Sequence, residues 1–334
     1  MPLRLQTIDA HAAGAPLRLV VGGFPTPGGR TLHEKRGWLE RRCEPLCRAL
    51  VGEPRGHADM TAALLTEAAA PGAAAGVIFM HAGGLGGFCG HGIIAVTTIA
   101  LERGLVTLPA GADSLTFETL AGPVRVRATR GASEGQGARV TLVAYRAAPA
   151  WVAAAGVPVT VRGHAARVDV AWAAGYYAVA DAELLGLPLG PEALPDLRRA
   201  GLQALREIDT QRVVQPAPDG VAPSLDGIVF TTASDREGAD LRGVTIYADG
   251  SVDRSPSGSG TTAALAVLDA MGLAPAGRPI VHESAWGTRF AARVAERVRD
   301  GERQAIVAEV EGSAWITGEH TFVLDESDPL RAGF

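Results

Sequence analysis

Short apolar runs separated by glycine-rich turns dominate the chain and predict a sheet-rich protein. The runs rich in β-branched residues, which favour strands, lie at residues 17–25, 76–84, 124–130, 138–145, 227–234, 244–250 and 305–312. Three longer stretches have the apolar spacing and length of helices, and they lie at 37–52, 92–105 and 261–272. Gly104 and Gly272 close the last two, as glycine commonly does at the end of a helix.

Strands and helices recur in a similar order in the second half of the chain, so the two halves look like structural repeats of each other and two lobes are expected. The length of 334 residues agrees, because single domains typically hold ~100–200 residues. We expect an N-terminal lobe at residues 1–132 and a C-terminal lobe at 133–320. The last segment, 321–334, could return to the N-terminal lobe.

Composition and charge limit the kinds of ligand and location. Hydrophobic residues make up 47% of the chain, charged residues 20%, and the net charge is −5, as in an ordinary globular protein. The 31 Lys and Arg residues are scattered, which argues against nucleic acid or an anionic membrane as partner. Glycines and Pro71 interrupt the longest uncharged run, residues 68–88, and no apolar leader precedes Asp9. We therefore expect a cytoplasmic protein with a small-molecule substrate.

Three cysteines, Cys43, Cys47 and Cys89, are an odd number in a long chain, and this favours reduced thiols over a disulfide framework. The spacing of Cys43 and Cys47 would suit two metal ligands on one helix face. No second Cys or His pair completes such a site, so we interpret both residues as helix packing and expect no metal.

One short motif occurs in both halves: Cys89-Gly-His-Gly and Ser257-Gly-Ser-Gly each precede an apolar helical run. The first N–H groups of a helix lack intrahelical acceptors, and with the helix dipole they form an anion site suited to a carboxylate. The thiolate of Cys89 would be stabilised there and could act as a base near neutral pH. Either copy alone is also compatible with an ordinary turn. Together, two residues with exchangeable protons indicate proton chemistry at a carbon next to a carboxylate.

Five segments carry a resemblance to a known family. Residues 53–60 (EPRGHADM), 88–95 (FCGHGIIA), 252–263 (VDRSPSGSGTTA), 282–290 (HESAWGTRF) and 328–334 (DPLRAGF) resemble, in order, the motifs of the proline racemase family. The resemblance implies an α/β fold with two lobes of the diaminopimelate epimerase type. It also implies an active site in the cleft between the lobes and chemistry that uses no cofactor.

The same resemblance assigns roles to individual residues. Cys89 matches the first catalytic position, and Ser257 occupies the second. Positions that hold the substrate in the family match Gly90, His91, Gly258 and Ser259, and Asp253 matches the acidic residue near the ring nitrogen. Read without the family, His91 is a polar residue at a helix start and Asp253 a turn former.

Ser257 decides which reaction we expect. Racemases and epimerases of the family usually carry Cys at both positions, and a serine hydroxyl is a much weaker acid than a thiol. The branch of trans-3-hydroxy-L-proline dehydratases resembles this chain, with Cys first and Thr second. The expected enzyme is therefore a lyase that dehydrates trans-3-hydroxy-L-proline to pyrroline-2-carboxylate. The alternatives are a proline racemase or hydroxyproline epimerase with a Cys/Ser pair, and a non-catalytic or different-substrate homologue.

Some positions depart from the family pattern. Ala12 and Ala15 stand where Thr and Glu are common, and Leu85 replaces an aromatic residue, so each change could reshape the substrate pocket. His57 and Asp59 either line the cleft or brace it. The sequence is compatible with a homodimer.

Overall fold

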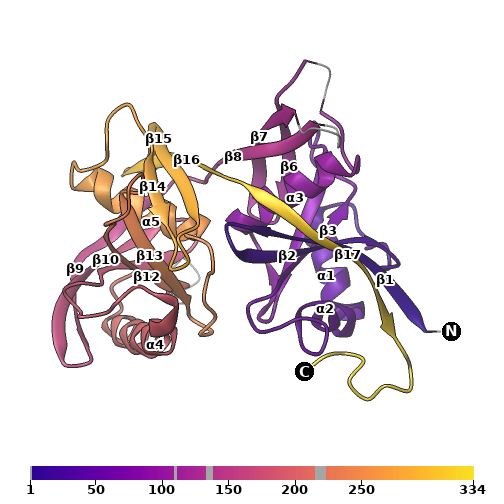
Figure 1. The fold of residues 1–334 in the computed structure, drawn as a ribbon, viewed down its shortest axis with the longest axis horizontal. Helices are drawn as coiled ribbons and strands as arrows, with labels where there is room; N and C mark the ends of the chain where they lie inside the picture. Colours follow the sequence, from indigo (N-terminus) through magenta and orange to yellow (C-terminus); the bar gives the residue numbers. More distant parts are fainter. Residues whose placement is uncertain (1, 109–110, 133–137, 215–222) are drawn as a thin grey trace. The chain divides into compact units, whose positions relative to one another are not determined.

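The computed structural model describes residues 2–108, 111–132, 138–214 and 223–334 (Figure 1). Within them the chain forms two compact units, Met1–Tyr145 with Glu311–Phe334 and Arg146–Val310. The expected lobe boundary near residue 132 lies too early, because the first unit continues through a further strand; residues 133–137 lie outside the described ranges. The chain also returns earlier than residue 321, at Glu311.

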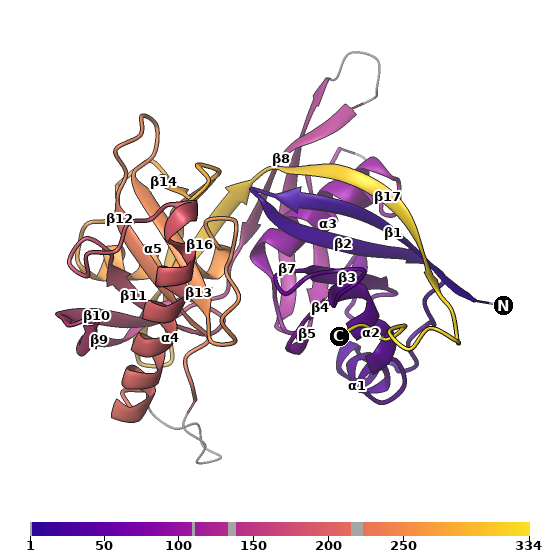
Figure 2. The ribbon, with the colours of Figure 1, turned by 60° about the horizontal axis from the view of Figure 1, so that its bottom comes forward.

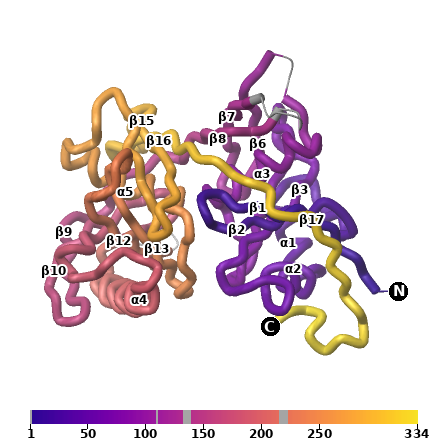
Figure 3. Tube along the Cα trace, viewed as in Figure 1, coloured from indigo at the N-terminus to yellow at the C-terminus, as the bar shows by residue number. Residues whose placement is uncertain are grey.

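The first unit is built on a mixed sheet. Strand β1 (Leu3–Ala12) is antiparallel to β17 (Ala314–Leu324) on one side and to β2 (Ala15–Gly22) on the other. The C-terminal strand β17 runs along β1 in Figure 3. Beyond β2 follow β3 (Thr61–Thr66), in parallel, and β4 (Ala75–His81), antiparallel to β3. The C-terminal return therefore adds a strand to the N-terminal sheet.

The sheet continues from β4 to the end of the unit. Strand β4 pairs with two further strands. It is parallel to β6 (Ser114–Thr119) and antiparallel to the short β5 (Gly84–Gly86). Strands β7 (Gly122–Ala132) and β8 (Ala138–Arg146) follow β6 as antiparallel neighbours. The pairing of β8 with β7 extends the first unit beyond the expected boundary.

The predicted helix at 37–52 is two helices, α1 (Leu32–Arg42) and α2 (Glu44–Val51). Pro45 lies in the first turn of α2, where its missing N–H is tolerated but where it cannot continue the preceding helix. Cys43 and Cys47 are buried among the apolar side chains of this unit, in agreement with a packing role. The third helix, α3 (Gly90–Glu102), is buried from Gly90 to Leu101 and packs against β1, β2 and β17. Figure 2 shows it beside these strands.

The second unit has its own mixed sheet. Strands β9 (Trp151–Val161), β10 (His164–Trp172) and β11 (Tyr176–Asp181) are antiparallel neighbours, and β11 is parallel to β12 (Gly227–Ala233). Strand β13 (Leu241–Tyr247) is antiparallel to β12 and parallel to β14 (Ile280–Glu283). Strand β15 (Arg289–Asp300) pairs with β14, and β16 (Arg303–Gly312) bridges to Ala150.

Helices complete the core of the second unit. A short 3₁₀ turn, η1 (Pro191–Ala193), leads into α4 (Leu194–Gln211), whose apolar side packs against β9, β12 and β13. The predicted helix at 261–272 is α5 (Gly258–Ala270), buried along most of its length among strands β9, β10, β11 and β15. A helix that is apolar on every side is stable only when it is covered all round. Both α3 and α5 are of this kind.

The two units repeat one order of strand pairings. Antiparallel, parallel, antiparallel, parallel and antiparallel pairs follow one another from β1 to β7 and again from β10 to β15. In each unit the buried helix joins two parallel neighbours, α3 between β4 and β6 and α5 between β13 and β14. The repeat predicted from the sequence is therefore present in the strand topology.

Candidate active site

Cys89 is the N-cap residue of α3 in the first unit. Its backbone is extended, with φ −144° and ψ 112°, and its side chain makes no capping hydrogen bond. The side chain is partly exposed, and Sγ lies 3.5 Å from both ring nitrogens of His91. The N–H groups of Gly90 and His91 belong to the first helical turn, which has no intrahelical acceptors. The thiol of Cys89, the imidazole of His91 and the N-terminus of α3 therefore lie next to one another.

Gly92 allows this approach because it has no side chain. A Cβ atom at Gly92 would lie 2.8 Å from Sγ of Cys89 and 2.6 Å from Cε1 of Phe79. Both distances are far below ordinary van der Waals contact, so a side chain at residue 92 would require the Cys89 thiol or the Phe79 ring to shift. The second glycine of the Gly-X-Gly frame is thus favoured by the packing around the thiol, in addition to any role in a turn.

Ser257 is the N-cap residue of α5 in the second unit. Its backbone has φ +63°, a conformation that costs a non-glycine residue free energy. The side chain is fully buried, and Oγ accepts a hydrogen bond of 3.1 Å from the N–H of Gly260. A Cβ at Gly260 would lie 3.0 Å from Cβ of Ser257 and 2.6 Å from Oγ1 of Thr245. Gly260 therefore has the same role beside Ser257 that Gly92 has beside Cys89: it leaves free the space in which a Cβ would clash with the N-cap residue.

Asp253 holds the turn before α5 together. Its Oδ1 accepts from the N–H and the hydroxyl of Ser255, at 2.9 and 2.7 Å, and the hydroxyl oxygen of Ser255 accepts from the N–H of Ser257. Oδ2 accepts a 2.8 Å hydrogen bond from the hydroxyl of Tyr247. The same Tyr247 oxygen lies 3.4 Å from Oγ of Ser257. Asp253 is 5% exposed, so the protein covers most of this residue.

Sequence reasoning missed Tyr247 and Ser255. The spacing of Asp253 and Ser255 is that of an Asx turn, a signal that could have been used. Tyr247 gave no signal, because a tyrosine near the end of a predicted strand has an ordinary packing explanation. Gly258 and Ser259 lie, as expected, in the first turn of α5. The predicted site residues thus form one group in each unit.

The segment 282–290 contacts the residues on either side of Ser257 at the start of α5. Nδ1 of the fully buried His282 lies 2.8 Å from Oγ1 of Thr261, whose hydroxyl donates to the carbonyl of Pro256. Desolvation by burial lowers the pKa of His282 to about 4, which keeps the ring neutral. The neighbouring Glu283 is also fully buried, with Nε of Arg242 3.1 Å from its Oε1. Through the contact between His282 and Thr261, this segment braces the start of α5.

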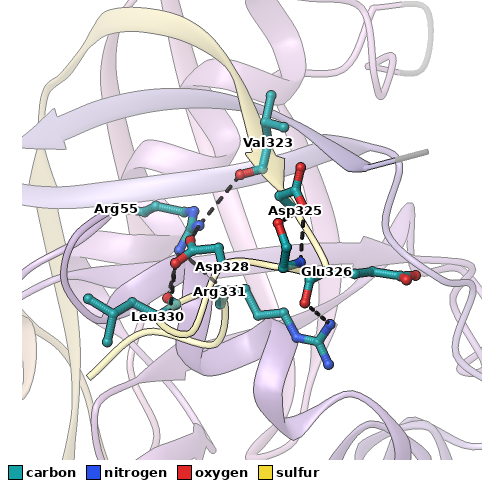
Figure 4. Close-up of polar contacts among 8 residues, drawn as sticks. Arg55, Val323, Asp325, Glu326, Asp328, Leu330 and Arg331 are labelled. Carbon is teal, nitrogen blue, oxygen red and sulfur yellow. Dashed lines mark hydrogen bonds and ion pairs between the residues drawn. The ribbon is translucent and has the colours of Figure 1, made fainter.

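The segments 53–60 and 328–334 contact each other in the first unit. Arg55 is 3.2 Å from Oδ2 of Asp328 and donates to the backbone carbonyls of Val323, Leu330 and Arg331 (Figure 4). The N–H of Phe334 donates to the carbonyl of Glu53. Two family segments 268 or more residues apart are thus joined by one guanidinium. Nearby, the N–H of Asp59 donates to Nδ1 of His57.

The three positions that depart from the family pattern are buried or partly buried in the first unit. Ala12 and Ala15 are buried and pair with each other at the end of the β1–β2 hairpin. Leu85 packs, partly buried, against the apolar core of the first unit.

Among the described residues, no group of three or more His, Cys, Asp or Glu side chains is arranged to hold a metal ion. No helix in the described ranges has the length and apolar character needed to span a membrane.

Comparison with known proteins shows which family the chain belongs to. The chain belongs to the proline racemase family, whose sequence model matches residues 7–334. It is 36% identical over 329 residues to a trans-3-hydroxy-L-proline dehydratase of Bacillus cereus, which covers 98% of this chain and 97% of the relative. It is 34% identical over 332 residues to a proline racemase of Clostridioides difficile, which covers 99% and 97%.

A solved structure extends the comparison to the fold. A hydroxyproline epimerase of Agrobacterium vitis, crystallised with bound trans-4-hydroxy-L-proline, matches with a TM-score of 0.85 and 29% identity over 99% of this chain and 94% of that one. The mixed α/β fold and the family resemblance expected from the sequence are confirmed. The relatives are named as dehydratase, racemase and epimerase, so the family includes both lyases and isomerases.

Proposed function

We propose that this protein is a lyase that dehydrates trans-3-hydroxy-L-proline to pyrroline-2-carboxylate without a cofactor. The observation that carries the proposal is the unequal pair at the two helix starts, a thiol at Cys89 and a hydroxyl at Ser257. Similarity alone does not choose between the reactions, because dehydratase and racemase relatives are almost equally similar at 36% and 34% identity. We therefore base the choice between the two reactions on the chemistry of residue 257.

The first step is removal of the Cα proton by the thiolate of Cys89. The contact between Sγ and His91, 3.5 Å to each ring nitrogen, suits stabilisation of the thiolate. We assign the first-turn N–H groups of Gly90, His91, Gly258 and Ser259 to the substrate carboxylate, where helix N-termini favour negative charge. We also assign Asp253 to the neighbourhood of the ring nitrogen. Charge that develops at Cα then spreads into a carboxylate that is already held.

The second step is loss of the 3-hydroxyl. In trans-3-hydroxy-L-proline the Cα hydrogen and the 3-hydroxyl lie on the same face of the ring. The thiol formed at Cys89 is therefore on the face of the departing hydroxyl and can return its proton there. The C3–O bond breaks, water leaves, a C2–C3 double bond forms, and the resulting enamine tautomerises to pyrroline-2-carboxylate. One thiol performs both proton transfers, and the opposite face needs none.

An isomerase is the second candidate. It is favoured by the 3.4 Å contact between Ser257 and Tyr247, which gives the serine a neighbour that can accept its proton. A racemase or 2-epimerase requires proton transfer on both faces of Cα, whereas the dehydratase requires it on one. The two proposals therefore predict different products from the same substrates.

The experiment is a panel of proline, 3-hydroxyproline and 4-hydroxyproline isomers, followed by chiral chromatography and a colorimetric assay for the pyrroline. We expect the pyrroline from trans-3-hydroxy-L-proline and little interconversion of L- and D-isomers. Cys89→Ser should lower turnover by about a thousandfold or more, since general acid–base groups contribute factors of this order, with an unchanged circular dichroism spectrum. Isomer interconversion at rates that match or exceed dehydration would favour the isomerase.

A further inference from the structure

Ser257 is connected to a buried carboxylate by one tyrosine. Oγ of Ser257 lies 3.4 Å from Oη of Tyr247, and Oη donates to Oδ2 of Asp253 at 2.8 Å. We propose that Tyr247 relays protons between Ser257 and Asp253, and that the relay gives the protein a second, slower activity: Cα-proton exchange at the Ser257 face of pyrrolidine carboxylates without a 3-hydroxyl. This inference rests on the substrate class of the proposed function.

The hydrogen bonds define a direction for the relay. Oγ of Ser257 accepts from the N–H of Gly260, so its own proton is available for donation. The hydroxyl of Tyr247 donates to Asp253, and a phenolic oxygen accepts as well as donates. An unbroken chain of donors therefore runs from Ser257 through Tyr247 to Asp253. At 3.4 Å the first link is long, but catalytic hydrogen bonds often tighten when substrate binds.

Local structure places Tyr247 at this point. A tight turn follows β13, in which the N–H of Tyr247 donates to the carbonyl of Ser251 and the N–H of Gly250 donates back to Tyr247. The N–H of Asp253 then donates to the carbonyl of Thr245, which returns the carboxylate to the end of the strand. The ring of Tyr177 packs edge-on against that of Tyr247, with 6.5 Å between the centroids. Backbone pairing and ring packing therefore fix both ends of the relay.

The step that the relay supports is balanced in protons and charge. Oγ of Ser257 takes the Cα proton while its own proton passes to Oη of Tyr247, and the proton of Tyr247 passes to Oδ2 of Asp253. The carboxylate becomes a neutral acid, and the negative charge moves to the substrate carbanion. Return of the three protons restores the starting state. A serine becomes a competent base only with such a neighbour.

The test measures exchange on each face of Cα separately. In deuterated water, exchange of L-proline with retention reports on Cys89. Loss of the Cα hydrogen of D-proline, counted in the D- and L-proline recovered together, reports on Ser257. We expect the unmodified protein to exchange both and Tyr247→Phe to slow D-proline exchange at least tenfold, while L-proline exchange changes less than twofold. The matched control is Tyr176→Phe, whose ring packs against Trp172, and we expect both rates to be retained.

The outcomes separate the relay from the proposed function. Undetectable exchange of D-proline by the unmodified protein, unchanged exchange by Tyr247→Phe, or an equal loss on both faces would each overturn the relay. The last of these results is what a merely structural tyrosine would produce. Failure of the unmodified protein to dehydrate trans-3-hydroxy-L-proline or to exchange L-proline would instead count against the proposed function.

Discussion

Cys89 and Ser257 occupy the same topological position in two units that share one order of strand pairings. Each is the N-cap residue of a buried helix that joins two parallel neighbouring strands. Their environments differ, because Ser257 is fully buried and caps its helix, whereas Cys89 is partly exposed and leaves its helix start uncapped. The repeated fold therefore presents two unlike acid–base groups.

The close packing around the thiol predicts a sensitive glycine. Gly92→Ala would place Cβ 2.8 Å from Sγ of Cys89, so we expect a loss of kcat/KM of about a hundredfold or more, the effect of displacing a catalytic group by an ångström. Gly87→Ala is the control, because its Cβ would meet only Ala121, at 3.9 Å. Steady-state kinetics of both variants check this, and equal activity would show that the contact does not constrain the thiol.

Thiol labelling should single out Cys89. Burial raises the pKa of Cys43, and it raises the pKa of Cys47 to about 12, so both remain protonated thiols at pH 8. Cys89 is the partly exposed thiol of the three. We expect iodoacetamide to modify Cys89 first under native conditions and all three cysteines in denaturant, as measured by peptide mass spectrometry.

A bound mimic of the planar carbanion should protect that thiol. Pyrrole-2-carboxylate should slow the labelling of Cys89, because it would occupy the proposed carboxylate site. Its amide lacks the negative charge and should not protect. Equal protection by acid and amide would argue against an anion site at the helix start.

Buried His282 predicts a dependence of stability on pH. Its pKa is about 4 in the folded protein and near 6.5 when exposed, so between these values the unfolded chain binds a proton that the folded protein does not. The free energy of unfolding should therefore fall as the pH is lowered from about 6.5 to about 4, by up to about 1 kcal/mol per pH unit. Below that window the contribution of His282 levels off.

Urea denaturation of the unmodified protein and of His282→Asn at several pH values measures this contribution. Asn keeps a polar group near Thr261 and cannot titrate, so the difference between the two curves isolates the imidazole from the carboxylates. We expect the variant to have a shallower slope in the window. Parallel curves would show that His282 is accessible to protons in the folded state.

The sequence predicted the helix starts well and the connections between segments poorly. Glycine and apolar periodicity are local signals, and they located α3 and α5 within three residues of their first residues. The contact of Arg55 with the last residues of the chain is not local, since its partners are more than 260 residues away. The boundary near residue 132 was wrong for a similar reason, because the pairing of β8 with β7 depends on a partner strand rather than on composition.

Tyr247 shows the same limit within the candidate site. Its distance to Ser257 results from a turn of five residues after β13 and from the Asx turn at Asp253. Either turn could be expected from Asp, Gly and Ser residues. Only their combination brings the phenol next to the serine hydroxyl.

Restoring a thiol at residue 257 should change the balance between the two reactions. Ser257→Cys places a stronger acid at the second helix start, so proton exchange on that face no longer depends on Tyr247. We expect racemisation of L-proline to rise at least tenfold. Dehydration of trans-3-hydroxy-L-proline should weaken, because the larger sulfur must fit a fully buried position 3.1 Å from the Gly260 nitrogen.

Ser257→Ala is the matched comparison for this change. It removes the hydroxyl and the N-cap hydrogen bond, which should cost about 1 kcal/mol of stability. Because Cys89 makes both proton transfers of the proposed dehydration, this variant should keep dehydration within about tenfold of the unmodified protein while exchange of D-proline disappears. Chiral chromatography, the pyrroline assay and deuterium exchange on the three proteins measure each activity. Loss of dehydration in Ser257→Ala by a factor like that expected for Cys89→Ser would mean that the hydroxyl takes part in the elimination itself, and the one-thiol mechanism would be wrong.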